Sequence, residues 1–259
     1  MQRIFVEKEK IDNEIKIVGE DVKHIQNVLR YKIGDALEIV VDGKVYNAQI
    51  TNMTSDEIYC SITNVLENTE EDKIHLHIIQ GLPKADKMEL IIQKTIELGA
   101  NEITPLEMER CVVKLDDLTV RKKVERWQKI AKSAAEQSKR NCIPKVNDIV
   151  NLKKMLELLR DYDIVIVAYE EEKQNTLKEE LEKLKNMDKA NYKIACIIGP
   201  EGGITAKEIE ILTQNNVKCV TLGKRILRTE TAPIALASII MYEMENYFVG
   251  GKNEKTRNR

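Results

Sequence analysis

Short apolar runs alternate with amphipathic runs along much of the chain, and this pattern is clearest near its carboxyl end. The run 193–198 is apolar without a helical period, which predicts a buried strand. Thr205 and Glu208 have the spacing of a capping box, so we expect a helix to begin there. A second strand is predicted at 218–222 and a last helix at 233–247, whose first residue, a proline, suits a first helical turn.

The same alternation continues upstream to residue 73. Apolar positions at helical spacing are most regular at 119–137, where Lys and Arg cover the opposite face of the predicted helix. Strands that alternate with helices indicate a largely parallel α/β sheet. The other predicted strands lie at 73–79, 103–108 and 163–168, and the other predicted helices at 86–98, 151–160 and 176–185. Gly99 is expected to end the first of these helices, and Thr176 and Glu179 have the spacing of a second capping box.

The first part of the chain predicts a different architecture, with several short strands and one helix at 21–30. Asp42-Gly43 lies between two apolar runs and is the strongest short signal for a hairpin. So many short strands in so few residues favour a small β-barrel. The predicted strands lie at 3–7, 36–41, 44–50 and 57–65.

A change in composition marks the expected domain boundary. The segment 64–72 is polar, acidic and poor in apolar residues, as expected of a connection between two domains. We therefore expect a barrel domain at 1–70, an α/β domain at 73–249 and a polar, basic tail at 250–259.

Glycine-bearing loops follow the last two predicted strands. Gly199-Pro-Glu-Gly-Gly203 follows one strand, and Gly223 opens the loop after the next. Open α/β sheets bind their ligands at the carboxyl ends of the strands. The first loop matches neither the dinucleotide-binding nor the P-loop pattern, and Glu201 within it disfavours a triphosphate. A ligand with positive or hydrogen-bond-donating groups, such as S-adenosylmethionine, fits this loop, and a plain tight turn is the alternative.

Gly199-Pro-Glu-Gly-Gly203, taken together with the segment from Leu222 to Ala232, resembles the SPOUT methyltransferases. Within that class the sequence is most similar to the bacterial 16S ribosomal RNA (uracil-N3)-methyltransferase family. The resemblance implies an α/β fold with a SPOUT-type trefoil-knotted, mostly parallel sheet, a small N-terminal PUA-like RNA-binding β-barrel domain, and a homodimer. The likeness covers nearly the whole chain, since it extends through 24–30, 82–89, 95–99 and 135–140.

The same resemblance implies S-adenosylmethionine-dependent methylation of N3 of one uridine in 16S ribosomal RNA. Such a transfer needs an acceptor in line with the methyl–sulfur bond, and stabilisation of the anion that develops as the N3 proton leaves. Arg228 is the candidate for this electrostatic role, although it could instead merely pair with Glu230. Glu230 is the second catalytic candidate, either as a base or as a residue that holds its loop shut.

Three segments are expected to bind the cofactor, around Ala168, Gly199 and Leu222. In the last of them, Thr229 and Thr231 would contribute backbone atoms while their side chains cap the following helix. The expected cofactor-binding residues are Ala168, Ile198, Gly199, Pro200, Glu201, Gly202, Gly203, Leu222, Gly223, Ile226, Leu227, Arg228, Thr229, Thr231 and Ala232.

RNA contacts are expected from cations and neighbouring polar groups, because phosphate contacts set affinity and position. For each single residue, a solvated surface charge is the alternative. The resemblance points to Arg3, His24, Arg30, Lys84, Lys87, Lys94, Arg110, Glu136, Gln137, Lys139, Arg140 and Arg225.

Bulk properties narrow the class of protein further. The net charge of −2 gives no global sign of a nucleic-acid partner, yet residues 121–145 hold nine Lys or Arg against two Glu, so an RNA-facing surface can coexist with a neutral total. Five scattered cysteines without a C-x-x-C pair argue against a disulfide framework or zinc site. His75 and His77 have no third ligand nearby, so we expect a packed or solvent-facing pair and no metal. The chain shows no signal-peptide pattern or membrane-length apolar run, so a cytoplasmic protein is expected.

Two other functions stay open on the sequence alone. A Rossmann-type NAD(P) enzyme is disfavoured, because the chain lacks the G-x-G-x-x-G pattern. A non-catalytic RNA-binding or ribosome-assembly protein would need the barrel, but it would not need two glycine-bearing pocket loops.

Overall fold

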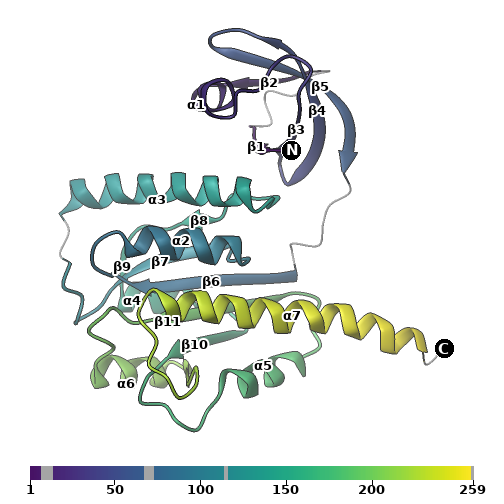
Figure 1. The fold of residues 1–259 in the computed structure, drawn as a ribbon. Helices are drawn as coiled ribbons and strands as arrows, with labels where there is room; N and C mark the ends of the chain where they lie inside the picture. Colours follow the sequence, from purple (N-terminus) through teal and green to yellow (C-terminus); the bar gives the residue numbers. More distant parts are fainter. Residues whose placement is uncertain (7–13, 67–72, 114–115, 258–259) are drawn as a thin grey trace. The chain divides into compact units, whose positions relative to one another are not determined.

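The structure is a computed structural model that describes residues 1–6, 14–66, 73–113 and 116–257. The chain divides into two compact units, which are drawn in Figure 1. The first unit comprises Met1–Glu71 and Ala135–Ile143, and the second comprises Asp72–Ala134 and Pro144–Arg259. The segment 135–143 therefore belongs with the amino-terminal unit although it lies in the middle of the sequence. Most of the expected boundary at 64–72 falls outside the described residues.

The first unit is an open, curled sheet with the strand order β1-β3-β4-β5-β2. Strand β1 is parallel to β3, whereas β3, β4, β5 and β2 pair antiparallel. The expected small barrel is thus present as a half-barrel, and its strand β2 was not predicted from the sequence. The strands are β1 (Arg3–Phe5), β2 (Glu14–Val18), β3 (Ala36–Val41), β4 (Lys44–Met53) and β5 (Glu57–Leu66).

The predicted hairpin at Asp42-Gly43 is confirmed. Val41 pairs with Lys44 across the turn, and Asp42 and Gly43 both have positive φ angles, of 47° and 75°. Two positive φ angles are those of a type I′ turn, whose twist matches that of the flanking strands.

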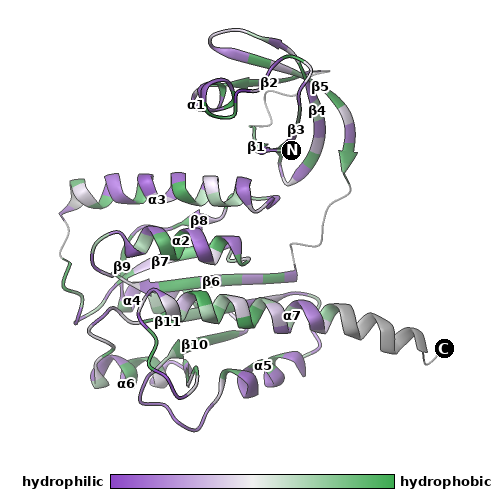
Figure 2. Ribbon diagram, in the orientation of Figure 1, coloured by the Kyte–Doolittle hydropathy of each residue, from purple (hydrophilic) through white to green (hydrophobic). Residues whose placement is uncertain are grey.

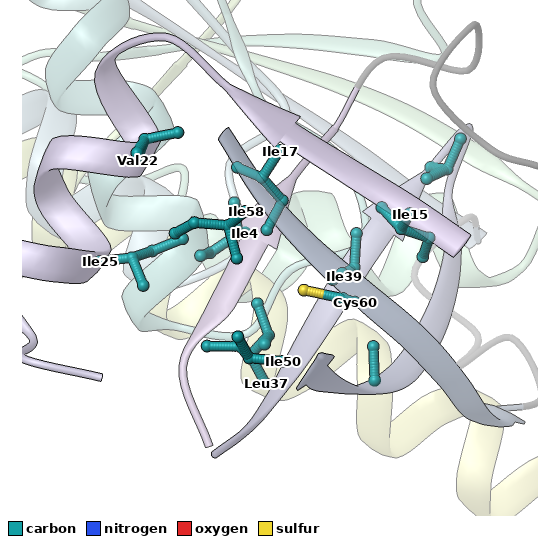
Figure 3. Close-up of a cluster of buried hydrophobic side chains, with 12 residues drawn as sticks. Ile4, Ile15, Ile17, Val22, Ile25, Leu37, Ile39, Ile50, Ile58 and Cys60 are labelled. Atoms are coloured by element: carbon teal, nitrogen blue, oxygen red, sulfur yellow. The ribbon is translucent and has the colours of Figure 1, made fainter. Parts of the chain in front are cut away.

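The predicted helix at 21–30 is a short α-helix followed by a π-helix, α1 (Glu20–Lys23) and η2 (His24–Val28). Val22 and Ile25 on these helices are buried and point toward Ile4, Ile17 and Ile58 of the sheet (Figure 3). This cluster is the core of the first unit, and it explains why the helical segment lies against the concave side of the sheet.

The second unit is a parallel sheet with helices on both faces. Its strand order is β12-β10-β11-β6-β7-β8, with β9 also paired to β7, and every pair is parallel. The mostly parallel α/β sheet is confirmed; the two-residue strands β8 and β9 were missed. The strands are β6 (Ile74–Gly81), β7 (Glu102–Glu107), β8 (Lys145–Val146), β9 (Val150–Asn151), β10 (Ile164–Ala168), β11 (Tyr192–Ile198) and β12 (Lys218–Val220).

The helices of the second unit occur where the sequence predicts them. One apolar cluster joins α4 and α6 to Val167, Ala195 and Ile197 of the sheet, while α7 packs on β6, β11, α2 and α5. Hydropathy colours show β10 and the middle of β6 as hydrophobic, in contrast to the mixed faces of the helices (Figure 2). The helices are α2 (Lys87–Glu97), α3 (Asp117–Gln137), α4 (Leu152–Leu158), α5 (Leu177–Lys185), α6 (Ala206–Gln214) and α7 (Thr231–Arg257). Helix α7 therefore continues into the segment expected to be a tail.

Helix ends follow the predicted local signals. Thr176 and Thr205 each cap a helix, and the carboxylates of Glu179 and Glu208 accept hydrogen bonds from the backbone N–H groups of these caps, so both capping boxes are confirmed. Gly99 after α2 has a φ angle of 107°, and a Cβ there would lie 2.7 Å from Met241 Cε. This glycine therefore both ends α2 and lets α7 pack against the turn.

No helix in the described part of the chain is long and apolar enough to cross a membrane.

A buried polar network joins β6 to β7. His77 is buried, with Nδ1 2.8 Å from Tyr162 Oη and Nε2 2.7 Å from Thr104 Oγ1. His75 Nε2 lies 3.1 Å from Glu102 Oε2. Burial lowers the pKa of His77 to about 4, and the hydrogen bond from His75 is the main cause that holds the pKa of Glu102 at about 2. His77 is thus a packed residue and His75 a half-exposed one, and both connect β6 to side chains of β7.

Acid is expected to destabilise the second unit through His77. Its pKa is lowered on folding, so its stabilising contribution is complete above about pH 6.5 and is lost as the pH falls toward 4, by up to about 3 kcal/mol. Glu102 adds a loss in the same direction below about pH 4.5. Urea unfolding at pH 7 and pH 4.5 measures this loss. His77→Gln should show a shallower pH dependence than the wild type, with His24→Gln as the exposed control, and equal slopes would contradict the assignment.

Candidate active site

A cavity of about 440 Å³ lies at the carboxyl ends of β10, β11 and β12. The three segments expected to bind a cofactor meet there, and each of their expected residues lines the cavity except Gly202 and Thr231. The lining residues that the sequence did not assign to the cofactor are Lys87, Tyr169, Glu170, Ile204, Thr221, Lys224 and Arg225. Those at 169, 170 and 221 could have been found, because they follow Ala168 or precede Leu222 at the same edge of the sheet.

The base of the cavity is held by Thr229. Its hydroxyl donates a 2.8 Å hydrogen bond to the carbonyl of Gly199 and accepts one of 3.0 Å from the amide of Gln80, which is fully buried. The glycine loop and the segment 222–232, which were both expected to bind the cofactor, are therefore in direct contact. The side chain of Thr229 was expected to cap the following helix. It joins two loops instead.

Close backbone contacts explain the glycines on both sides of this base. A Cβ at Gly81, the last residue of β6, would lie 2.7 Å from the nitrogen and Cδ of Pro200. Gly203 has a φ angle of 73°, and its N–H donates to the carbonyl of Pro200 to close the turn. Only residues without a side chain allow β6 and the glycine loop to approach this closely.

Arg110 supports the glycine loop from outside the cavity. Its guanidinium donates a 3.0 Å hydrogen bond to the carbonyl of Gly202, and a Cβ at Gly202 would lie 2.9 Å from Arg110 Cβ. Gly202 thus contacts this arginine and does not line the cavity. Arg110, which was expected to bind RNA, is placed to fix the conformation of the loop.

Lys87 lies between the two acidic residues of the site. Its Nζ is 2.9 Å from Glu201 Oε1 and 3.1 Å from Glu230 Oε2. A hydrogen bond from its own backbone N–H, together with Lys87, keeps the pKa of Glu230 below its ordinary value despite burial. A low pKa makes a carboxylate a poor proton acceptor. The geometry therefore favours the loop-holding role of Glu230 over the role of a base.

Arg228 is almost free on the rim of the cavity. Its side chain is 84% exposed, and its Nη1 lies 4.0 Å from Glu230 Oε1, which is a weak ion pair. Its backbone is fixed, because its carbonyl accepts from the N–H groups of Thr231 and Ala232 at the start of α7. The arrangement holds the residue in place and leaves the guanidinium available to a ligand. Thr231 itself is the exposed first residue of α7.

The charges of the cavity are divided between its sides. Lys224, Arg225 and Arg228 are exposed cations on the segment 222–232, around Ile226, which is 80% exposed. Glu170 contributes an exposed carboxylate beside Gly203. An anionic chain is therefore attracted to the rim, whereas a positively charged group fits beside Glu170.

Several residues expected to bind RNA hold the first unit together instead. Arg3 is 7% exposed and pairs with Glu38 at 2.9 Å, and it donates to Asn141 Oδ1 and to the carbonyl of Lys139. Lys139 Nζ also lies 3.0 Å from Glu38. Arg140 is buried as well. These contacts attach the segment 135–143 to the sheet of the first unit, and the role of Asn141 was not predicted from the sequence.

The other expected RNA-binding residues are distributed over both units. His24 on η2 is exposed, as is Arg30, which follows η2 and has a φ angle of 57°. Lys84 is exposed, and its backbone N–H donates to Glu201. Lys94 pairs with Glu97 on α2, at 2.9 Å. Gln137 at the end of α3 is exposed, and the neighbouring residue, Glu136, is half-buried.

Comparison with known proteins relates both units to one kind of enzyme. The model of an RNA methyltransferase domain matches residues 70–241, and that of an RNA methyltransferase PUA domain matches residues 17–63. The chain is 41% identical to ribosomal RNA small subunit methyltransferase E of Bacillus subtilis, over 95% of this chain and 98% of the relative.

Two solved structures resemble the chain over most of its length. The putative methyltransferase from Legionella pneumophila, in complex with the bound cofactor SAM, is 30% identical with a TM-score of 0.81, over 93% of this chain and 96% of that one. Ribosomal RNA small subunit methyltransferase E from Neisseria gonorrhoeae, bound to S-adenosyl methionine, is 29% identical with a TM-score of 0.80, over 93% of this chain and 97% of that one.

Proposed function

The chain belongs to the RNA methyltransferase family that includes ribosomal RNA small subunit methyltransferase E, and from this we propose that it methylates small-subunit ribosomal RNA with S-adenosylmethionine as the methyl donor. The acceptor that the resemblance to the uracil-N3 family implies is N3 of one uridine of 16S ribosomal RNA. The observation that carries the proposal is the cavity at 168–170, 198–204 and 221–232, whose two main loops are joined by Thr229 and Lys87.

The residues of the cavity fit S-adenosylmethionine. Its volume of about 440 Å³ lies in the range of small-molecule sites. Ile198, Leu222 and Leu227 supply apolar surface, and the carboxylate of Glu170 suits the positive charge of the ligand. When bound, this cofactor supplies an electrophilic methyl group on a sulfonium, so the protein needs no metal for the transfer. The expected residues that line the cavity are proposed to hold it, with Gly202 acting through Arg110 and Thr231 acting only through the start of α7.

Arg228 is proposed to stabilise the acceptor base. The N3 proton of uracil must leave before or during attack, and negative charge then spreads to the flanking carbonyl oxygens. A guanidinium near these oxygens stabilises the anion. Glu230, paired with Lys87, keeps the segment in place, and the proton passes to water.

RNA is proposed to approach the rim that carries Lys224, Arg225 and Arg228, because exposed cations attract phosphates. Residues 1–70 form the second proposed RNA-binding surface, through His24 and Arg30. The functional α/β domain would then be 73–249.

A homodimer is also proposed. Leu90 on α2 and Ile239 and Tyr242 on α7 are exposed hydrophobic side chains on two helices that pack together. Exposed apolar surface of this kind is typical of an interface between subunits.

S-adenosylhomocysteine is expected to stabilise the protein against thermal unfolding. At a ligand concentration 100-fold above Kd, the free energy of unfolding should rise by about 2.7 kcal/mol. In a separate test of the reaction, mass spectrometry of 16S ribosomal RNA incubated with enzyme and S-adenosylmethionine should detect one methylated uridine. NAD and ATP serve as controls and should give no shift. No response to S-adenosylhomocysteine would favour a non-catalytic RNA-binding protein, and a response to NAD would favour a Rossmann-type NAD(P) enzyme.

A further inference from the structure

Lys87 occupies a position that is normally unfavourable for a lysine. It is the first residue of α2, where the positive end of the helix dipole opposes a cation. Two residues earlier, Ala85 has a φ angle of 53°, a conformation that costs energy for residues other than glycine. Unfavourable local choices of this kind point to a role outside the helix itself.

The contacts of this segment explain both features. The backbone N–H of Lys84 and the Nζ of Lys87 both donate to the carboxylate of Glu201, at 3.1 Å and 2.9 Å. The same Nζ lies 3.1 Å from Glu230. The strained turn at Ala85 therefore directs two donors to the glycine loop, and the lysine reaches the segment 222–232 as well.

The bridge is partly shielded from solvent. The side chains of Lys87, Glu201 and Glu230 are 31%, 26% and 15% exposed, respectively. The hydrogen bond to Glu201 raises the pKa of Lys87, and both carboxylates have lowered pKa values, so all three groups stay charged at neutral pH. Ion pairs that are shielded in this way are screened less by salt than exposed ones.

The two loops are thus joined at two levels. Thr229 connects them at the base of the cavity, where its hydroxyl meets the carbonyl of Gly199. Lys87 connects them a second time through their acidic side chains and itself lines the cavity. Both carboxylates lie within reach of one nitrogen atom, so they would repel each other if that nitrogen were removed.

We propose that Lys87 is a positioning residue whose ammonium group holds the two cofactor-binding loops together by neutralising Glu201 and Glu230, and that it does not act as an RNA contact. The inference rests on the proposed function, because its effect is on the cofactor site. Its chemical consequence is specific. Loss of the cation leaves two carboxylates in repulsion, with the exposed Arg228, 4.0 Å from Glu230, as the remaining cation beside them. That repulsion is relieved when either carboxylate is protonated or replaced by an amide.

Calorimetric titration with S-adenosylhomocysteine tests this at pH 8 and pH 5.5. Lys87→Met should weaken binding about tenfold or more at pH 8 and less at pH 5.5, because repulsion between the two carboxylates raises the pKa of one of them and so favours its protonation as the pH falls. The double variant Lys87→Met with Glu201→Gln should recover most of the affinity at pH 8, and Lys87→Arg should bind like the wild type. Lys183→Met is the matched control, because Lys183 pairs with Glu180 at 2.7 Å on α5, away from the cavity.

The outcomes separate the inference from the function on which it rests. Wild-type protein that does not bind S-adenosylhomocysteine overturns the proposed function and the inference with it. Wild-type binding together with unchanged affinity of Lys87→Met overturns the inference alone. A loss that is equal at both pH values and is not recovered by Glu201→Gln also overturns it, since a general loss of structure would behave in that way. If Lys87→Met does not fold, the double variant is measured in its place, and failure of that variant to fold and bind overturns the inference.

Discussion

Replacing Arg228 with alanine is expected to lower kcat for RNA methylation by about 10²–10³-fold, the usual effect of removing one group that stabilises a developing anion. The side chain is 84% exposed and makes only a 4.0 Å contact with Glu230, so its loss should leave the free energy of unfolding unchanged. Steady-state transfer of labelled methyl groups to 16S ribosomal RNA measures kcat, single-turnover transfer measures the chemical step alone, and titration with S-adenosylhomocysteine should show near-normal cofactor affinity.

Arg225→Ala is the comparison variant, because Arg225 lies on the same segment and is equally a charged rim residue. It is expected to raise KM for RNA and to reduce the salt dependence of binding, as loss of a phosphate contact does, with kcat retained. If Arg228→Ala behaved in the same way, Arg228 would be a phosphate contact and not part of the chemistry. Near-normal turnover of Arg228→Ala would remove it from the mechanism.

Gly81→Val is expected to weaken cofactor binding strongly. A Cβ at this position would lie 2.7 Å from the backbone nitrogen of Pro200 and 3.0 Å from the carbonyl carbon of Gly199, so the backbone of the glycine loop must move. Overpacking of this kind costs about 1–3 kcal/mol of stability. The displaced loop also loses its contact with Thr229, and we therefore expect a fall in affinity for S-adenosylhomocysteine of at least about 100-fold, or ~2.7 kcal/mol.

Gly34→Ala separates the loss of stability from the loss of the site. Gly34 belongs to the first unit and has a φ angle of 97°, and a Cβ there would have no heavy atom within 4 Å, so alanine costs only backbone strain, on the order of 1 kcal/mol. This variant should be destabilised with unchanged cofactor affinity. A Gly81→Val protein that binds S-adenosylhomocysteine as tightly as the wild type would show that the loop can move without harm.

Local signals in the sequence predicted local structure well. The capping boxes at Thr176 and Thr205 and the hairpin at Asp42-Gly43 each depend on residues within four positions of one another, and all three are present. The apolar runs likewise predicted β6, β10 and β11, because buried parallel strands carry no other pattern. Strand β2 was missed, although Ile15 and Ile17 alternate with polar neighbours in it and are buried.

The charged residues were harder to assign, because their partners lie far away in the sequence. Arg3 was expected to bind RNA, but it meets Asn141, 138 positions away. Lys87 and Arg110 were expected to bind RNA for the same reason, and both contact the glycine loop instead. A cation looks the same in a sequence whether it is free or paired, so only the fold distinguishes the two.

Helix α7 has a consequence for the biosynthesis of the protein. Its buried residues Leu236, Ala237 and Ile240 cover a sheet whose strand β6 is translated some 150 residues earlier. A nascent chain therefore carries uncovered apolar strands until this last helix leaves the ribosome, and such chains are prone to misfolding and depend on chaperones. The segment before α7 completes the ligand site. A growing polypeptide therefore becomes active only after this segment and the buried part of α7, up to Ile240, have been translated.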